Sequence, residues 1–347
     1  MSLIVVATDR FAEHLTPPGH PECPERAEVM DVVAAEWRTR GGEVVAPRMV
    51  SREHLARVHS PEHLRRMSET TGVAMAIDAD TYTSPDTYEV ALLSAGAAVE
   101  GVERVMGGKH SRALVLSRPP GHHAERDRAM GFCFFNNVAV AAAHARTLGA
   151  KRVVIVDYDV HHGNGTQEIF EDDPHVLYIS THQFPYYPGT GAASEIGRGE
   201  GTGHIVNLPL EAGATDDDYR VTFEQVVAPV IRQFAPDLLL ISAGFDAHER
   251  DPLGGMRVST AGFAAMTTML RQLAETCCGG RLVVITEGGY DLKALGECLR
   301  TVVDGLASET CPPVSWPTGG PASSRGIAAV NAVRAAHTRF WSFQESA

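Results

Sequence analysis

The chain has 347 residues, of which 44% are hydrophobic and 21% are charged, and its formal net charge at pH 7 is -13. These fractions are ordinary for a globular protein, and the length suits one large α/β domain or two smaller ones. The acidic balance and the lack of any Lys/Arg run argue against a nucleic-acid partner. An acidic surface is compatible with cationic substrates.

The six cysteines form no CxxC motif and no disulfide-like framework. The N-terminal segment has no basic region before its short apolar run, which argues against a signal peptide. No apolar stretch approaches the ~18 residues of a membrane span. We therefore expect a reduced, soluble, cytoplasmic protein without a membrane partner.

Strands and helices are expected to alternate along most of the chain. Apolar, β-branched runs predict buried strands at residues 3–7, 113–117, 152–157, 176–180, 204–208, 237–242 and 281–286. Helices are expected over residues 24–40, from Ser51, from Ser60, and over residues 84–106, 136–148, 165–171, 216–234, 260–275 and 291–306. The alternation predicts an α/β fold with a mostly parallel sheet covered on both faces.

No internal repeat and no central linker divide the sequence, so we expect a single domain over residues 1–347. The only Pro/Gly/Ser-rich break covers residues 308–325. We expect this segment to be a surface tether, followed by a terminal helix over residues 326–344 that docks back onto the domain.

Four of the expected strands end in segments rich in reactive side chains. These segments are RPPGHHA (118–124), DYDVHHGNGT (157–166), SAGFDAH (242–248) and EGGYD (287–291). Open α/β sheets bind their ligands at the carboxyl ends of the strands, so the four segments predict one shared site.

Asp159 and His161 are two residues apart, so their side chains point to the same side of an extended backbone. Together with Asp246 they could supply the three protein ligands of an open catalytic zinc site, and the same set could take Fe(II) or Co(II). Alone, a D-x-H triplet is more often a cap, a turn or a salt link, and a lone aspartate is more often a cap. The convergence of these three residues with the His122-His123 pair favours a metal site over those common roles.

The His122-His123 pair follows a Pro-Pro-Gly turn that can aim both rings into the crevice. Neighbouring imidazoles can differ in pKa, so one can act as general base while the other carries charge. Asp157 and Asn164 are the candidate orienting partners. Tyr290 follows two glycines and could donate a hydrogen bond to an oxyanion. For each residue taken alone, a packing or surface role is more common.

Six motifs in this order resemble those of the histone deacetylase and acetylpolyamine amidohydrolase superfamily. They are RPPGHH (118–123), GFCFFNN (131–137), DYDVHHGNGT (157–166), PGTG (188–191), AGFDAH (243–248) and EGGY (287–290). The resemblance covers nearly the whole chain and implies an arginase-like, three-layer α/β/α fold with an eight-stranded sheet. It also implies zinc-dependent removal of an acetyl group from an amine.

The resemblance also implies roles for individual residues. The zinc ligands would be Asp159, His161 and Asp246, and the catalytic residues His122, His123, Tyr290, Asp157 and Asn164. The substrate-binding residues would be Gly131, Phe132, Tyr187, Leu253, Gly289 and Arg26, the last at an inner channel for acetate. A structural K⁺ or Na⁺ would be held by Asp157, Asp159, His161, Ser180 and Thr181, and a second by backbone oxygens around Phe170, Asp173, Val176 and His204.

Three residues refine the expected subclass. Asn164 stands where class I enzymes have aspartate, so the chain resembles the class II and bacterial branch. Tyr290 stands where weakly active class IIa enzymes have histidine, which implies efficient deacetylation. Leu253 replaces the glutamate gatekeeper of the polyamine-selective enzyme, which weakens that interpretation without removing it.

Several hypotheses therefore stay open at this point. The substrate could be an acetyl-lysine peptide, a related small acyl-amide or an acetylpolyamine, and the chain could form a homo-oligomer. A protein of another class could keep the pocket only to sense acyl-lysine or metal. An arginase-type binuclear manganese hydrolase would share the fold, but it would need further ligands.

Overall fold

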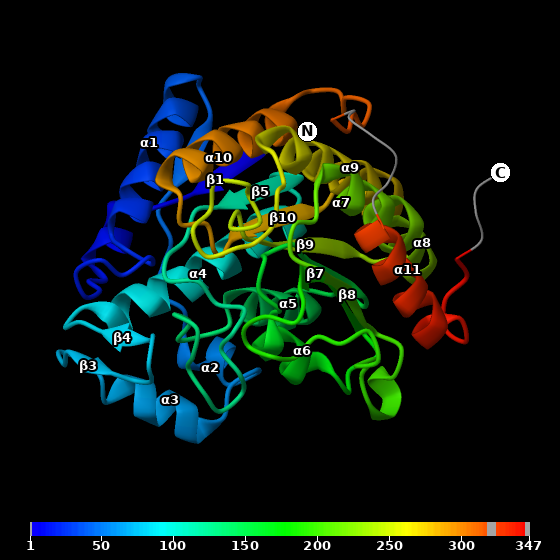
Figure 1. Cartoon of the computed structure of the whole chain (residues 1–347). Helices are drawn as coiled ribbons and strands as arrows, with labels where there is room; N and C mark the ends of the chain where they lie inside the picture. The colour runs from blue at the N-terminus through cyan, green and yellow to red at the C-terminus, as the bar shows by residue number, and fades with distance from the viewer. Residues whose placement is uncertain (1, 318–323, 344–347) are drawn as a thin grey trace.

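The structure is a computed structural model that describes residues 2–317 and 324–343 (Figure 1). Eight strands form one sheet in the order β2-β1-β5-β10-β9-β6-β7-β8, and every neighbouring pair is parallel. Its strands are β1 (Leu3–Val6), β2 (Glu43–Val45), β5 (Arg112–Val115), β6 (Val153–Asp157), β7 (Val176–Gln183), β8 (Ile205–Leu210), β9 (Leu238–Ala243) and β10 (Leu282–Thr286). A separate antiparallel hairpin consists of β3 (Met75–Ala76) and β4 (Tyr82–Thr83).

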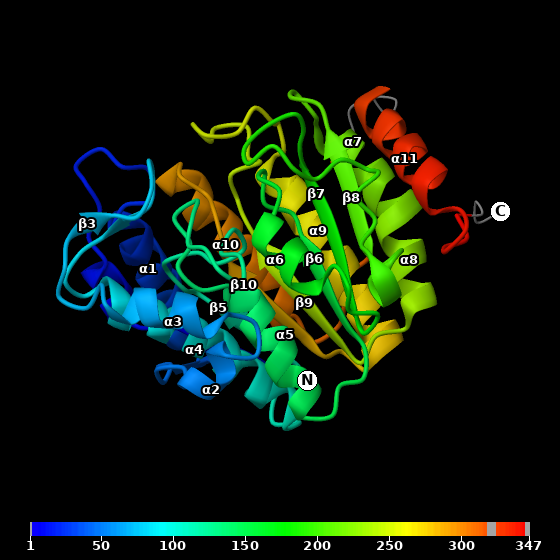
Figure 2. The same ribbon diagram turned by 90° about the horizontal axis from the view of Figure 1, so that it is seen from below.

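Helices cover both faces of the sheet, which gives three layers (Figure 2). The helices are α1 (Glu25–Thr39), α2 (Arg52–Leu55), α3 (Pro61–Ser68), α4 (Thr87–Met106), α5 (Asn137–Thr147), α6 (Asn164–Phe170), α7 (Asp216–Thr222), α8 (Ala228–Phe234), α9 (Thr260–Cys278), α10 (Leu292–Ala307) and α11 (Ser324–His337). Short turns of other helix types are η1 (Asp9–Glu13), η2 (Gly199–Gly201) and η3 (Phe223–Val227). A hydrophobic core fills the space between each face of the sheet and its helices. One core lies against α1 and α7–α10, and the other lies against α2–α5.

The central strands have the near-continuous apolar sequences expected of a sheet that is buried on both faces. All residues of β6, β9 and β10 are buried. The register pairs Asp157 with Ser242 and Ser242 with Ile285, so these strands end at the same level. The segments that follow them therefore meet at one edge of the sheet.

Side-chain caps fix where several helices begin, and two of these caps adjoin the sequence motifs. The Asn136 side chain accepts a hydrogen bond from the backbone of Ala139 at the start of α5. Asp291, directly after Tyr290, accepts one from the backbone of Ala294 at the start of α10. Each cap satisfies a backbone N–H that has no partner within the helix.

The expected fold class is confirmed, including the eight-stranded sheet and three layers that the resemblance implied. The strand β2 was not expected from the sequence, because it has only three residues and none of them is buried. The expected helix over residues 216–234 is interrupted by the π-helical turn η3. The hairpin β3–β4 lies in a segment for which no structure was expected.

Helix α11 packs on α7 and β8 and buries Ala329, Val330 and Val333. It ends at His337, short of the expected end at residue 344, because the chain turns there and Trp341 donates a hydrogen bond to the Gly203 carbonyl. Residues 318–323 of the expected tether and residue 344 lie outside the described residues. We propose that the whole chain forms a single domain, since α11 docks on the same sheet.

Within the described ranges, no helix is both long enough and apolar enough to cross a membrane.

Candidate functional site

Three acidic and imidazole side chains meet where β6 and β9 end. Asp159, His161 and Asp246 each place one potential ligand atom within 4.8 Å of the others, and all three residues are buried. His161 Nδ1 lies 3.1 Å from Asp159 Oδ1 and 3.1 Å from Asp246 Oδ2. The sequence predicted this cluster.

Backbone groups hold the two carboxylates in place. Asp159 Oδ2 accepts a hydrogen bond of 2.8 Å from the Gly288 backbone, and Asp246 Oδ1 accepts one of 2.9 Å from the Val160 backbone. A side chain at Gly244 would collide with the Asp159 carboxylate, and one at Gly288 would collide with that of Asp246. The close approach of the backbone therefore requires glycine at both positions.

The charges of this cluster suit a bound cation. Burial alone would lower the pKa of His161, but hydrogen bonds to Asp159 and Asp246 raise it to about 10. Burial and the charge of Asp159 raise the pKa of Asp246 to about 7. Two buried carboxylates thus compete for the proton of one imidazole. One nitrogen and two carboxylate donors fit a divalent metal ion, which would neutralise them.

The tandem histidines lie beside this cluster with different partners. His122 Nδ1 lies 3.0 Å from Asp157 Oδ2, whereas His123 Nδ1 lies 2.7 Å from Asn164 Oδ1. The two ring centroids are 4.1 Å apart. The structure thus forms both expected pairs.

The two imidazoles have opposite pKa shifts. Burial alone would lower the pKa of His122, but the carboxylates of Asp159 and Asp157 outweigh it and raise the pKa to about 10. Burial and the neighbouring charge of His122 hold the pKa of His123 well below its usual value. At neutral pH, His122 is therefore charged and His123 is neutral.

Glu287 supports the tandem histidines, although it was not predicted as a site residue. Its Oε2 accepts hydrogen bonds from the backbones of Gly121 at 2.7 Å and His122 at 3.2 Å, and its Oε1 accepts one of 2.7 Å from the Ser242 hydroxyl. Burial raises its pKa to about 7. The only sequence signal was its position at a strand end, because its partners lie far away in the chain.

Tyr290 lies above a buried arginine. The Arg26 guanidinium is 5.0 Å from the centre of the Tyr290 ring and donates hydrogen bonds to the Gly289 carbonyl at 2.8 Å and to Glu22 at 2.9 Å. Burial and the charge of Asp246 raise the pKa of Tyr290 well above its usual value. Its hydroxyl therefore keeps its proton at neutral pH and is able to donate it in a hydrogen bond.

Aromatic side chains surround the cluster. The Phe132 ring is 5.9 Å from that of Tyr290, and the Tyr187 ring is 5.2 Å from that of His123. Gly131 lies so close to the His123 ring that any side chain there would collide with it. Leu253 is linked to these aromatic residues through its backbone. Its carbonyl accepts a hydrogen bond of 2.6 Å from the Tyr186 hydroxyl.

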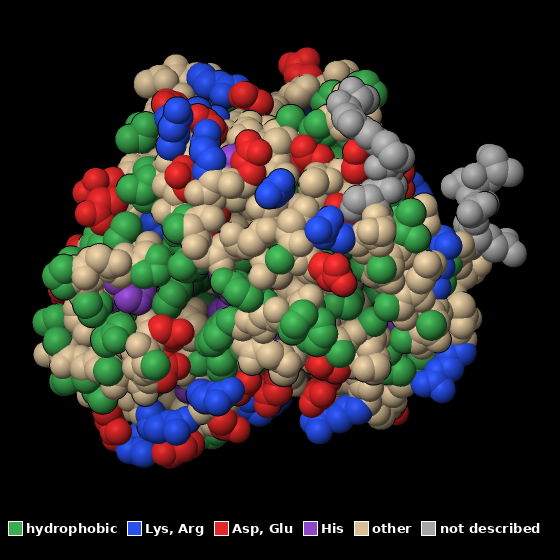
Figure 3. All heavy atoms as spheres, viewed as in Figure 1, with side chains coloured by type: hydrophobic (Ala, Val, Ile, Leu, Met, Phe, Trp, Pro, Cys, Tyr) green, Lys and Arg blue, Asp and Glu red, His purple; other side chains and the backbone are tan. Residues whose placement is uncertain are grey.

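Tyr186 was not predicted as a site residue, although it belongs to an aromatic loop that the sequence displays. Its ring stacks on that of His161 with the centroids 5.5 Å apart. Other large apolar side chains are exposed at the surface, among them Leu15, Val73 and Met75. Figure 3 shows hydrophobic side chains gathered over β3 and β4 on the same face of the molecule.

Contacts join several of the residues expected around monovalent cations. Asp157 of β6 pairs with Ser180 of β7, and the Thr181 hydroxyl lies 3.5 Å from the Asp157 carbonyl. In the second group, the backbone of Asp173 donates to the Phe170 carbonyl at 3.0 Å, and that of Val176 to the Asp173 carbonyl at 3.4 Å. The fourth member, His204, is not joined to the other three by these hydrogen bonds. Its carbonyl accepts a hydrogen bond of 2.9 Å from the Tyr178 backbone. Both cation sites stay predictions.

Comparison with known proteins identifies the family of this chain. The histone deacetylase domain family matches residues 20–306. The chain belongs to the histone deacetylase family. It is 41% identical over 332 residues to histone deacetylase 15 of Arabidopsis thaliana. The matched region covers 93% of this chain and 59% of that protein.

Two further comparisons agree. The chain is 39% identical over 340 residues to the human polyamine deacetylase HDAC10, covering 92% of this chain and 50% of that protein. A crystal structure of the HDA15 HD domain matches with a TM-score of 0.89 and 39% identity, covering 98% of this chain and 96% of that one. The chain thus spans only about half to three fifths of these two full-length relatives.

Proposed function

We propose that this member of the histone deacetylase family is a zinc-dependent amidohydrolase that removes an acetyl group from an acetylated amine such as acetyl-lysine. The observation that carries the proposal is the position of one charged and one neutral imidazole, His122 and His123, beside the cluster of Asp159, His161 and Asp246. Hydrolysis of an amide needs a base for water, an acid for the leaving amine and a group that stabilises the oxyanion. The site offers a candidate for each.

In this proposal Asp159, His161 and Asp246 hold the metal ion. A zinc ion there would polarise the amide carbonyl and make a water molecule more acidic. The hydrogen bonds from Gly288 and Val160 orient the two carboxylates, so the donor atoms face one another before any ion binds.

His123 is the proposed general base, because its Nδ1 faces the Asn164 amide and its imidazole is neutral. Its Nε2 would take a proton from water and later give it to the leaving amine. His122 keeps its charge through Asp157 and stabilises negative charge that develops in the site. Glu287 holds the loop that carries both rings.

Tyr290 is the proposed donor of a hydrogen bond to the oxyanion. Its backbone N–H donates to Asp251 at 2.6 Å, and Arg26 lies against its ring, so the side chain is held from two directions. Phe132, Tyr187, Gly131 and Gly289 would line the approach of the acylated chain, with Leu253 at the rim.

The same groups could also hydrolyse an acetylpolyamine, and the similarity to a protein named polyamine deacetylase supports this second candidate. The uncharged Leu253 at the rim speaks against it, since a cationic polyamine gains more from a carboxylate there.

We also propose a K⁺ or Na⁺ ion near Asp157 and Ser180. Because all six cysteines are free thiols, we propose a reduced, cytoplasmic location.

A comparison of substrates tests this proposal. The full-length protein is stripped of metal with a chelator, reloaded with Zn²⁺ and offered an acetyl-lysine peptide, acetylspermidine and acetylputrescine. We expect release of acetate from the peptide with a higher kcat/KM than from either polyamine. A preference for a polyamine would favour the second candidate. No turnover of any substrate by the zinc-loaded protein would favour a protein that only binds acyl groups.

A further inference from the structure

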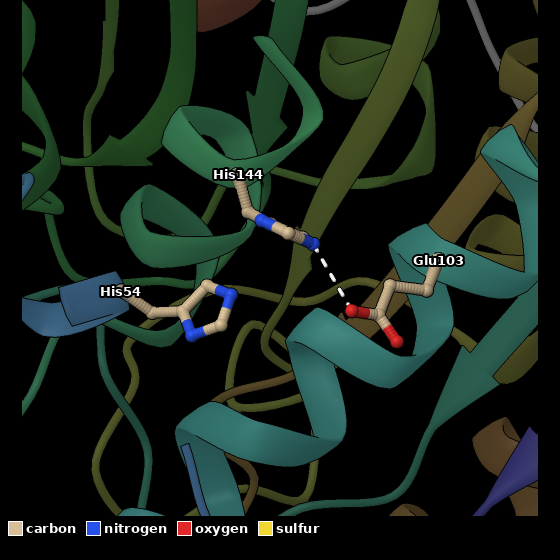
Figure 4. Close-up of side chains that lie close together, drawn as sticks. All are labelled: His54, Glu103 and His144. Carbon is tan, nitrogen blue, oxygen red and sulfur yellow. Dashed lines mark hydrogen bonds and ion pairs between the residues drawn. The ribbon is translucent and has the colours of Figure 1, made fainter. Parts of the chain in front are cut away.

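A second cluster of side chains that could bind a metal ion lies among the helices α2, α4 and α5 on one face of the sheet. His54 of α2, Glu103 of α4 and His144 of α5 each place one potential ligand atom within 4.8 Å of the others. Figure 4 shows the three side chains converging from three different helices. Two imidazoles and one carboxylate form a donor set that proteins use for Zn²⁺ and related ions.

Hydroxyl groups orient both rings toward the centre of the cluster. The Ser51 hydroxyl lies 2.6 Å from Nδ1 of His54, and the Thr147 hydroxyl lies 3.3 Å from Nδ1 of His144. Each contact leaves the Nε2 atom of the ring for another partner. Histidines that bind metals commonly have such a partner on the opposite nitrogen, which fixes the ring and its tautomer.

The three side chains are already close together without an ion. Nε2 of His144 lies 3.2 Å from Oε1 of Glu103, and the rings of His54 and His144 are 4.5 Å apart in an edge-to-face arrangement. An ion would replace the proton shared by His144 and Glu103.

Nearby arginines do not leave the cluster with a net positive charge. Arg57 donates a hydrogen bond of 2.8 Å to Glu53, and Arg48 donates one of 3.1 Å to Glu100. Arg48 also binds Oε2 of Glu103 at 2.6 Å, which leaves Oε1 as the oxygen ligand. Arg57 also contacts Nδ1 of His144 at 3.3 Å, and Thr147 could replace it as the partner of a metal-bound ring.

Solvent reaches this cluster from one side. His144 is buried, whereas His54 and Glu103 are half-buried, so an ion could enter without unfolding and keep water as a further ligand. A bound ion would join three segments of the chain, since α2 packs on α5 and α5 packs on α4.

We propose that His54, Glu103 and His144 bind a divalent transition-metal ion such as Zn²⁺ and join α2, α4 and α5 through it. This site is separate from the cluster at the strand ends and shares no residue with it. Its role is structural, because the ion would link helices whose contacts otherwise rest on side-chain packing and hydrogen bonds.

Zinc binding to the full-length Asp246→Ala variant tests the proposal, because that change removes a ligand from the cluster at the strand ends. Isothermal titration with Zn²⁺ is expected to show one remaining site, and Zn²⁺ is expected to raise the melting temperature. Adding His54→Ala should abolish both effects. Thr147→Val should weaken the affinity by roughly 10-fold or more, since it removes the partner of the His144 ring.

His175→Ala in the same background is the matched control, because His175 is exposed and lies outside the cluster. It should bind Zn²⁺ like its parent, and circular dichroism should show that each variant is folded. In the otherwise unchanged protein, His54→Ala should leave amide hydrolysis unaltered while lowering the zinc content by one ion per chain. Equal zinc binding with and without His54→Ala would overturn the proposal, as would no zinc binding in the Asp246→Ala parent.

Discussion

Nδ1 of His123 lies 2.7 Å from the side-chain oxygen of Asn164, an uncharged partner, whereas the neighbouring His122 faces a carboxylate. This difference helps to keep one imidazole neutral beside a charged one. Exchanging the amide for a carboxylate should therefore change the pH at which the site works.

Asn164→Asp should raise the pKa of His123, because a carboxylate stabilises the protonated ring. In the unchanged protein, burial and the charge of His122 hold the pKa of His123 well below its usual 6.5, so this residue is neutral at pH 6.5. The acidic limb of the kcat/KM profile should move to higher pH in the variant. Glu125 accepts a hydrogen bond from the Asn164 amide, so Glu125→Gln is the control and should leave the limb in place. An unmoved limb in Asn164→Asp would exclude His123 as the base.

Tyr290→Phe should lower kcat by about 10²–10³, since it removes one hydrogen bond to the oxyanion. Zinc content and melting temperature should stay unchanged, because the ring and its contact with Arg26 remain. Tyr186→Phe is the matched control, because its hydroxyl binds the Leu253 carbonyl at the rim. Equal losses in both variants would contradict the role of Tyr290.

Gly288→Ala should weaken zinc binding at the strand ends, because the added methyl group would collide with the Asp246 carboxylate. Activity should fall with the zinc content and recover in part at a large excess of Zn²⁺. Gly305→Ala is the control, since a methyl group there would meet only the Thr267 side chain at 3.6 Å. Normal zinc affinity in Gly288→Ala would show that the backbone does not position this ligand.

Glu22→Gln should destabilise the fold by about 3–5 kcal/mol, because breaking a buried ion pair leaves charges without a partner. Glu22 is fully buried and accepts hydrogen bonds from Arg118 at 2.6 Å and Arg26 at 2.9 Å. Burial alone would raise the pKa of Glu22, but these two guanidinium groups outweigh it and hold the pKa well below its usual value.

A carboxyl group whose pKa is lowered by folding stabilises the folded state. This stabilisation is fully present above the unfolded-state pKa of 4.5 and is lost as the pH falls below that value. Urea unfolding of Glu22→Gln should therefore depend less on pH between neutral and acidic conditions than unfolding of the unchanged protein does. Parallel pH dependence in the two proteins would mean that Glu22 does not carry this stabilisation.

The ligands and bases could be predicted because they lie within short motifs at strand ends. Asp159 and His161 are two residues apart, and the His122-His123 pair is contiguous. Their supports could not be predicted, because the contacts join distant segments. The bond from Gly288 to Asp159 spans 129 residues, and the bond from Gly121 to Glu287 spans 166.

The same limit applies to the fold. Apolar, β-branched runs such as Val153–Val156 predicted the central strands, whereas β2 has no such run and is recognised as a strand by its pairing with β1. His54, Glu103 and His144 come from three separate helices, so no sequence spacing indicated that they would meet.

Acetate release measured on one preparation shows whether hydrolysis needs a metal ion held by Asp159, His161 and Asp246. The full-length protein is assayed with an acetyl-lysine peptide as purified, after removal of metal with a chelator and after reloading with Zn²⁺, alongside Asp246→Ala treated in the same way. We expect that release stops on chelation, returns with Zn²⁺ and stays absent in Asp246→Ala. Release that survives complete metal removal, or that Asp246→Ala retains in full, would contradict this expectation.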